Sequence, residues 1–139
     1  MARRIFESLA CWPNLDGNRP SIPVTLSTLD GKLVVEKQPI PVDTGFTGTL
    51  LLHQETFAHF EKAELPDAES RIYRTLIGPI PMRTARARIR FPMGGEVETF
   101  VDTPKYGVGK TLIGLQALNR LELLLSGNSL ETCLVRETT

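Results

Sequence analysis

Short segments of alternating polar and apolar residues make up most of this chain, and 11 glycines and 10 prolines interrupt them at close intervals. Alternation with a period of two is typical of β-strands that bury one face, whereas helices repeat apolar residues at spacings of three and four. Glycine and proline mark the turns between such strands. The pattern therefore predicts an all-β fold with short connections.

The clearest predicted element is a hairpin over residues 22–41, with its turn at Asp30 and Gly31. An Asp-Gly pair suits the positive φ angles of a type I′ turn. Folding about that turn places Leu26 opposite Val35, with both side chains on one face. The second strand then leads directly into a short polar loop.

A second predicted hairpin spans residues 83–102 and turns through three residues near its centre. In that register Arg90 faces Glu98 and Arg86 faces Asp102, which gives one charged and one apolar surface. The arginines at alternate positions, Arg86, Arg88 and Arg90, also fit a phosphate-binding surface. The acidic residues across the hairpin favour an ordinary solvated face instead.

The remaining segments complete one domain. Residues 54–61 and 116–122 carry apolar residues at helical spacing and predict short helices. Residues 112–115 form a buried strand, and residues 123–135 form a C-terminal hairpin. We therefore expect a single domain over residues 1–139, with its core at about residues 20–135 and one or two short helices.

Charge and hydropathy exclude several classes of partner. Lysine plus arginine and aspartate plus glutamate each total 16, so no field of one sign attracts nucleic acid or acidic lipid. The longest apolar runs are far shorter than the roughly 20 residues of a membrane helix. With no secretion signal at the start of the chain, we expect a cytoplasmic protein that binds neither nucleic acid nor membrane.

The residues that most often hold metals are too few and too scattered for a site. His53 and His59 are six positions apart, which fits no common ligand spacing on a helix. Cys11 and Cys133 lie near opposite ends of the chain and indicate reduced thiols, not a disulfide framework. We expect no metal and no cofactor.

One loop carries the residues of a carboxylate-dependent reaction. Asp43 follows the second strand of the first hairpin, and Thr44 and Gly45 come directly after it. Gly45 lets the chain pass close beneath the carboxylate, and its amide can donate to a carboxylate oxygen. The Thr44 side chain can form a hydrogen bond to backbone across a symmetric contact and so lock the loop. An Asp-Thr-Gly triplet alone is a weak signal, so its context decides.

The string from Val42 to Gly48, followed some 65 residues later by Ile113 and Gly114, resembles the retropepsin-like aspartic proteases. It is similar above all to small bacterial and archaeal members with Phe after the triplet, and the likeness covers about residues 22–133. The resemblance implies a closed barrel in which Ile113 and Gly114 support the active-site loop. Phe46 stands where viral and pepsin members have Ala or Ser, and we expect it either to support the active-site loop or to narrow the substrate cleft.

The same resemblance implies a glycine-bearing flap over the substrate. Leu76, Ile77 and Gly78 form an apolar tip that fits this role, although an ordinary β-turn explains the same residues. Asp102 and the residues after it echo the triplet, but a proline replaces the glycine. We expect Asp102 to be structural.

Asp43 supplies one carboxylate, whereas this chemistry uses two that share a proton. We therefore expect a homodimeric aspartic endopeptidase that cuts peptide or protein substrates, with the terminal strands at the dimer interface. Two alternatives stay open. One is a dimeric module of the same fold that binds a peptide or partner without cutting it. The other is an unrelated β-barrel binding protein with a chance triplet.

Overall fold

The computed structural model describes residues 3–138, which form two mainly antiparallel β-sheets and several short helices. The strands are β1 (Ile5–Pro13), β2 (Ser21–Ser27), β3 (Leu33–Pro41), β4 (Leu50–Leu51), β5 (Ile72–Thr75), β6 (Gly78–Arg90), β7 (Glu96–Pro104), β8 (Leu112–Ile113), β9 (Leu123–Ser126) and β10 (Glu131–Thr138). The helices are α1 (Gln54–Phe57), α2 (Leu115–Leu118) and the 3-10 turns η1 (Ala58–Ala63) and η2 (Asp67–Glu69). Within this range no helix is long and apolar enough to cross a membrane.

The larger sheet has the strand order β3-β2-β6-β7-β4-β8, and β5 pairs with β6 beyond this path. Alternate residues of its central strands point into one core, as the period of two predicts. The fully buried members include Val24, Leu26, Ala85, Ala87 and Ile89. Phe57 and Phe60, from the predicted helix near residue 54, close the core.

The prediction of a closed barrel is wrong. Over residues 3–138 neither sheet closes, and a single bridge between Val42 and Ile113 connects the two end strands of the larger sheet. The strands β4 and β8 have two residues each, so they form too few ladder hydrogen bonds to carry a closed barrel.

The first hairpin is confirmed, and Leu26 lies opposite Val35 as expected. Its turn differs from the prediction. Gly31 has a φ of +90°, but Asp30 does not have a positive φ, so the turn is not of type I′. The strands separate at Ser27 and Leu33, which leaves a longer connection between them.

The second hairpin forms with a different register from the predicted one. Arg90 pairs with Glu96 instead of Glu98, and Asp102 lies opposite Thr84 instead of Arg86. The turn is centred on Met93, which has a φ of +62°, and not on Gly94, and Phe91 lies outside the ladder. The loop therefore takes five residues, and every pairing shifts by two positions.

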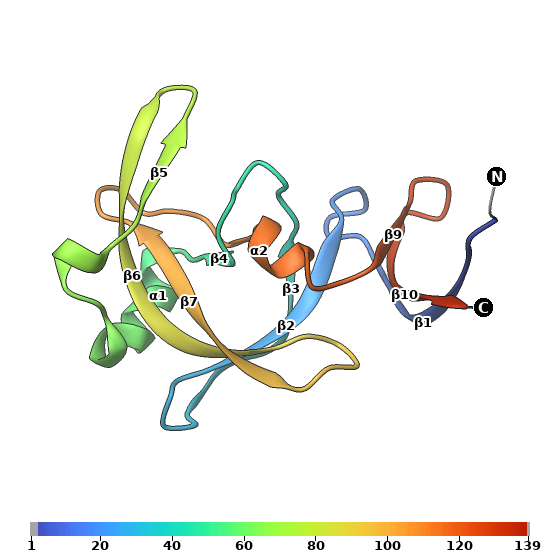
Figure 1. Cartoon of the computed structure of the whole chain (residues 1–139), viewed down its shortest axis with the longest axis horizontal. Helices are drawn as coiled ribbons and strands as arrows, with labels where there is room; N and C mark the ends of the chain where they lie inside the picture. Colours follow the sequence, from blue (N-terminus) through green and yellow to red (C-terminus); the bar gives the residue numbers. More distant parts are fainter. Residues whose placement is uncertain (1–2, 139) are drawn as a thin grey trace.

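The smaller sheet has the order β1-β10-β9 and contains the predicted C-terminal hairpin. Figure 1 shows this terminal sheet at one end of the molecule, with both chain ends beside it. Trp12 attaches it to the larger sheet: its indole packs against the main core and its Nε1 donates to the carbonyl oxygen of Ser21. The terminal strands thus pair with each other within one chain.

The expectation of reduced thiols is wrong, because Cys11 and Cys133 form a disulfide. The two residues are direct partners in the β1–β10 ladder, with Cα atoms 4.1 Å apart. The sequence did not indicate the bond because the cysteines are 122 residues apart and only the pairing of the chain ends brings them together.

Candidate active site

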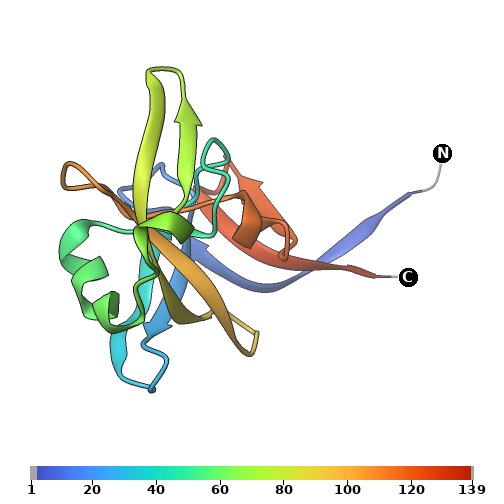
Figure 2. The same cartoon turned by 60° about the vertical axis from the view of Figure 1, so that its left-hand side comes forward.

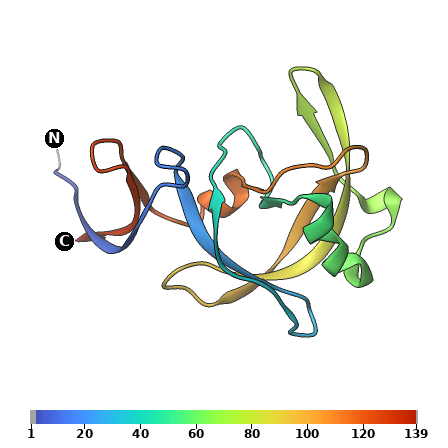
Figure 3. The same cartoon turned by 180° about the vertical axis from the view of Figure 1, so that it is seen from behind.

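Asp43 lies at the start of the connection between β3 and β4, where two neighbouring segments hold its backbone. Its amide donates to the carbonyl oxygen of Ile113 at 2.8 Å, and the Val42 amide donates to that of Pro20 at 3.0 Å. Figures 1 and 3 show this connection standing beside α2, which follows β8 in the chain. Backbone hydrogen bonds to two different segments therefore hold Asp43 in position, independently of any contact made by its side chain.

The carboxylate of Asp43 is half-buried and has a fixed direction. Its Oδ1 accepts a hydrogen bond from the Gly45 amide at 2.8 Å. A Cβ at Gly45 would lie 3.1 Å from that same oxygen, which is tighter than an ordinary contact. Glycine thus allows the close turn, while Thr44 and Gly45 themselves remain exposed beside the carboxylate.

Phe46 points inward, away from the exposed half of the loop. Its side chain is 9% exposed and packs in a small core with Leu51 and Met82, next to the half-buried Tyr73. The Phe46 and Tyr73 ring centroids are 4.8 Å apart. From the sequence we expect Phe46 either to support the loop or to narrow the substrate cleft, and this packing fits support of the loop.

Ile113 and Gly114 lie directly against this loop. Ile113 is fully buried, and the Gly114 amide donates to the Thr49 carbonyl oxygen at 2.9 Å. A Cβ at Gly114 would lie 2.6 Å from the Phe46 carbonyl oxygen and closer still to that of Gly48. Only glycine permits the two segments to come this close.

The predicted flap is a hairpin of β5 and β6 that projects from the sheet, as Figures 1 and 2 show. Leu76 and Ile77 at its tip are almost wholly exposed. Gly78 has a φ of +118°, and the Thr75 hydroxyl donates to its carbonyl oxygen at 2.8 Å. The tip is therefore an ordered turn that presents apolar side chains to the outside.

A buried polar cluster at the base of this hairpin was not predicted. Asp102 has no exposed surface; Thr84 Oγ1 donates to its Oδ1 at 2.5 Å and the Tyr73 hydroxyl donates to its Oδ2 at 3.0 Å. Arg71 Nη1 lies 4.0 Å from Oδ2 and replaces Arg86 as the charged partner. Burial raises the pKa of Asp102, and it raises the pKa of Tyr73 to about 12. The sequence could have revealed this cluster only through the correct register of the second hairpin, because that register places Thr84 opposite Asp102.

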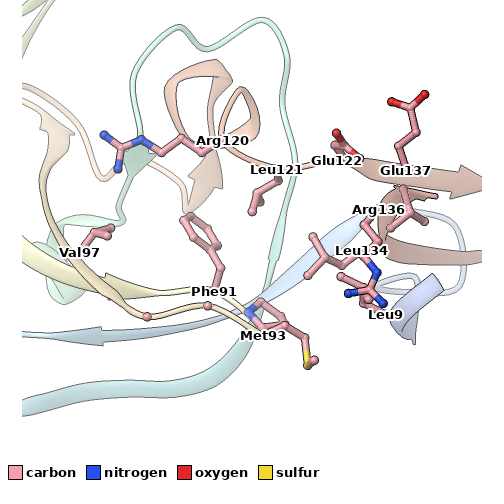
Figure 4. Close-up of a pocket in the computed structure, with 14 residues that line it drawn as sticks. Leu9, Phe91, Met93, Val97, Arg120, Leu121, Glu122, Leu134, Arg136 and Glu137 are labelled. Carbon is pink, nitrogen blue, oxygen red and sulfur yellow. The ribbon is translucent and has the colours of Figure 1, made fainter. Parts of the chain in front are cut away.

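A large groove lies away from the Asp43 loop. It has a volume of about 630 Å³ and separates the loop between β6 and β7 from the terminal sheet. Figure 4 shows Phe91, Leu121 and Leu134 lining it, with Arg136 and Glu137 among its charged residues. None of its lining residues belongs to the Asp43 loop or to the flap.

Within the described part of the chain, one group has the composition of a metal site. Cys11, Glu131 and Cys133 place ligand atoms within 4.8 Å of one another. Both sulfur atoms are committed to the disulfide, so neither is a thiolate available to a metal. The group therefore fits a covalent cross-link and not a metal centre.

Comparison with known proteins gives structural similarity without sequence similarity. No protein-family model and no curated protein matches the chain. A retropepsin-like aspartic protease from Rickettsia conorii matches with a TM-score of 0.54 at 12% identity, covering 100% of this chain and 98% of the other. The EIAV protease in complex with the inhibitor HBY-793 matches with a TM-score of 0.50 at 18% identity, covering 78% of this chain and 92% of the other. The chain therefore has the fold of the retropepsin-like proteases; at this identity, function has to be argued from its own residues.

Proposed function

We propose that this protein is an aspartic endopeptidase that acts as a homodimer, with one Asp43 from each copy. The observation that carries the proposal is the Asp43 carboxylate, half-exposed and held in one direction by the Gly45 amide. A carboxylate that activates water needs this combination of fixed geometry and access. The similarity of the fold to two aspartic proteases supports the same conclusion.

The dimer follows from the number of carboxylates. In the proposed mechanism one ionised Asp43 takes a proton from a water molecule as the water attacks the peptide carbonyl carbon. The protonated Asp43 of the second copy stabilises the developing oxyanion, and the pair titrates as one unit. A two-fold axis beside Thr44 and Gly45 brings the carboxylates together, and the exposure of both residues leaves room for that contact.

The substrate is proposed to be an extended peptide that lies between the Asp43 loops and the flaps. The exposed Leu76 and Ile77 would cover it with apolar surface. The burial of Phe46 supports catalysis over a binding module, because the ring does not occupy the exposed side of the loop. No metal or cofactor enters this mechanism.

The Cys11–Cys133 disulfide bears on where the protein works. Disulfides persist in oxidising compartments and are rare in the reducing cytoplasm. The bond therefore weighs against the cytoplasmic location expected from the sequence. Thiol labelling of the protein as isolated from its native cells tests this point, since two labelled cysteines would support the cytoplasmic location.

The activity is tested by incubating the wild type and Asp43→Asn with a diverse peptide mixture from acid to neutral pH. Cleavage by the wild type alone supports the proposal. Equal peptide binding by both, without cleavage, would support the non-catalytic module instead. Circular dichroism of Asp43→Asn provides the control for folding.

The shared site is tested by mixing. When Asp43→Asn is added in about ninefold excess and the chains are allowed to exchange, most wild-type chains pair with an inactive partner. Activity per wild-type chain should then fall to about one-tenth, because a heterodimer has one carboxylate. Unchanged activity per chain would mean that a single copy holds a complete site.

A further inference from the structure

Asp102 is a buried carboxylate whose hydrogen bonds lead to the flap. A buried carboxylate is costly unless donors and cations surround it. One donor, Thr84, lies opposite Asp102 in the β6–β7 ladder of the sheet, whereas the other, Tyr73, belongs to β5 of the flap hairpin. Asp102 itself belongs to β7, in the body of the sheet. The carboxylate thus connects the body of the molecule to the hairpin that projects from it.

Tyr73 is the residue that attaches β5 to the rest of the molecule. The other three residues of β5 are exposed, whereas Tyr73 is half-buried and its hydroxyl reaches Asp102. β5 pairs with β6 along one edge only, so its side-chain anchor decides how firmly it is held. Within β5 that anchor is the Tyr73 phenol.

The same phenol lies against the Asp43 loop. Its ring packs on Phe46 with the centroids 4.8 Å apart. A Cβ at Gly48 would lie 2.7 Å from Cζ of Phe46 and closer still to the Tyr73 hydroxyl. Tyr73 therefore touches the segment that follows Asp43 as well as the carboxylate beneath the flap.

Arg71 fixes the other side of the phenol. Its Nη1 donates to the Tyr73 oxygen at 3.1 Å and to Oε1 of Gln116 at 3.3 Å. Gln116 also accepts a hydrogen bond from Thr49, which comes just before β4. The hydroxyl of Tyr73 thus accepts from the Arg71 guanidinium and donates to the carboxyl group of Asp102. Its pKa of about 12 keeps it protonated, and hence a donor, at neutral pH.

We propose that Asp102 and Tyr73 are positioning residues that set how the flap stands over the Asp43 loop and thereby help to hold the peptide. This role rests on the proposed protease function. Neither residue touches the reacting atoms: Asp102 is wholly buried, and Tyr73 acts through the hairpin it anchors. A purely structural role would lower stability throughout the molecule without a selective effect on the flap or on substrate binding.

The test compares wild type, Tyr73→Phe and Tyr106→Phe by hydrogen exchange and by peptide-cleavage kinetics. Tyr73→Phe keeps the ring on Phe46 and removes only the hydroxyl. We expect amides of residues 72–80 to exchange about tenfold faster, the loss expected for one buried hydrogen bond. Amides of β2 should be unchanged. KM should rise about fivefold while kcat stays within about twofold, because the peptide is held less well but Asp43 is unmoved.

Tyr106→Phe is the matched control, since Tyr106 is the other tyrosine of the chain and is exposed. It should behave as wild type in both measurements. Unchanged exchange over residues 72–80 in Tyr73→Phe would overturn the proposal. So would an equal increase along the whole chain, or a fall in kcat at constant KM.

A double-variant cycle with Asp102→Asn tests whether the two residues act together. Asp102→Asn alone should also speed exchange over residues 72–80. Added to Tyr73→Phe it should change that exchange by clearly less than it does alone, because the bond that the two residues share is already lost. Fully additive effects would refute the pairing. If the wild type cuts no peptide, the protease function fails, while the exchange data still decide whether this bond holds the flap.

Discussion

Replacing Gly114 by alanine tests whether close packing beneath the Asp43 loop maintains the site. Gly114 has a φ of −102°, a backbone conformation that alanine also adopts, so the effect of the substitution is steric. The new Cβ would lie 2.6 Å from the carbonyl oxygen of Phe46 and closer to that of Gly48. These are backbone atoms, which cannot rotate away as a side chain can.

The expected loss of stability can be worked from these contacts. Adding a methyl group to a tightly packed site costs about 1–3 kcal/mol. The loop and α2 must also separate. This weakens two hydrogen bonds shorter than 3 Å, from the Gly114 amide to the Thr49 carbonyl oxygen and from the Leu115 amide to the Phe46 carbonyl oxygen. Each bond contributes about 1 kcal/mol. We expect a total loss of about 2–4 kcal/mol in the free energy of unfolding.

Urea unfolding at neutral pH measures this loss, with Gly127→Ala as the matched control. A Cβ at Gly127 meets no atom within 4 Å, so the control contains only the general effect of alanine on the unfolded chain. Peptide cleavage should fall in Gly114→Ala because Asp43 bonds to Ile113, the residue before the substitution. A free energy of unfolding within about 0.5 kcal/mol of the control would refute the steric argument.

Three further substitutions test other parts of the structure. Cys11→Ser, or reduction of wild type with dithiothreitol, should lower the free energy of unfolding by about 2–4 kcal/mol in urea; an unchanged midpoint would count against the disulfide. Burial raises the pKa of Asp102, so the folded state binds a proton on this carboxyl group more tightly than the unfolded chain does. The contribution of Asp102 to stability therefore falls as pH rises above about 4. The free energy of unfolding of Asp102→Asn should therefore increase relative to wild type from about pH 4 to 7, and parallel pH curves would contradict this. Gly78→Ala, at a φ of +118°, should distort the flap tip and raise KM with little change in melting temperature; an unaltered KM would argue against a flap.

The local parts of the fold were predictable because they depend on near neighbours in the sequence. Alternation along residues 22–41 gave the first hairpin and the Leu26–Val35 pair, and helical spacing gave the turn that buries Phe57. The same was true of the Asp43 loop, whose glycine bonds to a carboxylate two residues away. Each of these features needs only a few consecutive residues.

The features that were missed depend on long-range pairing. The disulfide requires the two chain ends to form one sheet, and the buried cluster requires the correct register of β6 and β7. Centring the turn on Met93 instead of Gly94 moved every pairing by two residues and changed the charged partner of Asp102 from Arg86 to Arg71. A shift of two positions keeps each side chain on its face, so the hydrophobic pattern could not detect it.

The residues of the Asp43 loop are divided between two tasks, and this division favours the supporting role of Phe46 over its alternative role in the substrate cleft. Phe46 and Gly48 are buried and fix the loop on β8 and Tyr73, whereas Thr44 and Gly45 are exposed beside the carboxylate. Sequence order alone leaves both roles open; in the structure the chain reverses at Gly45 and turns Phe46 inward. The exposed half is the surface that a second copy would have to cover to bring two carboxylates together. One chain thus supplies a rigid support for Asp43, and the proposed partner supplies the second carboxylate that the chemistry requires.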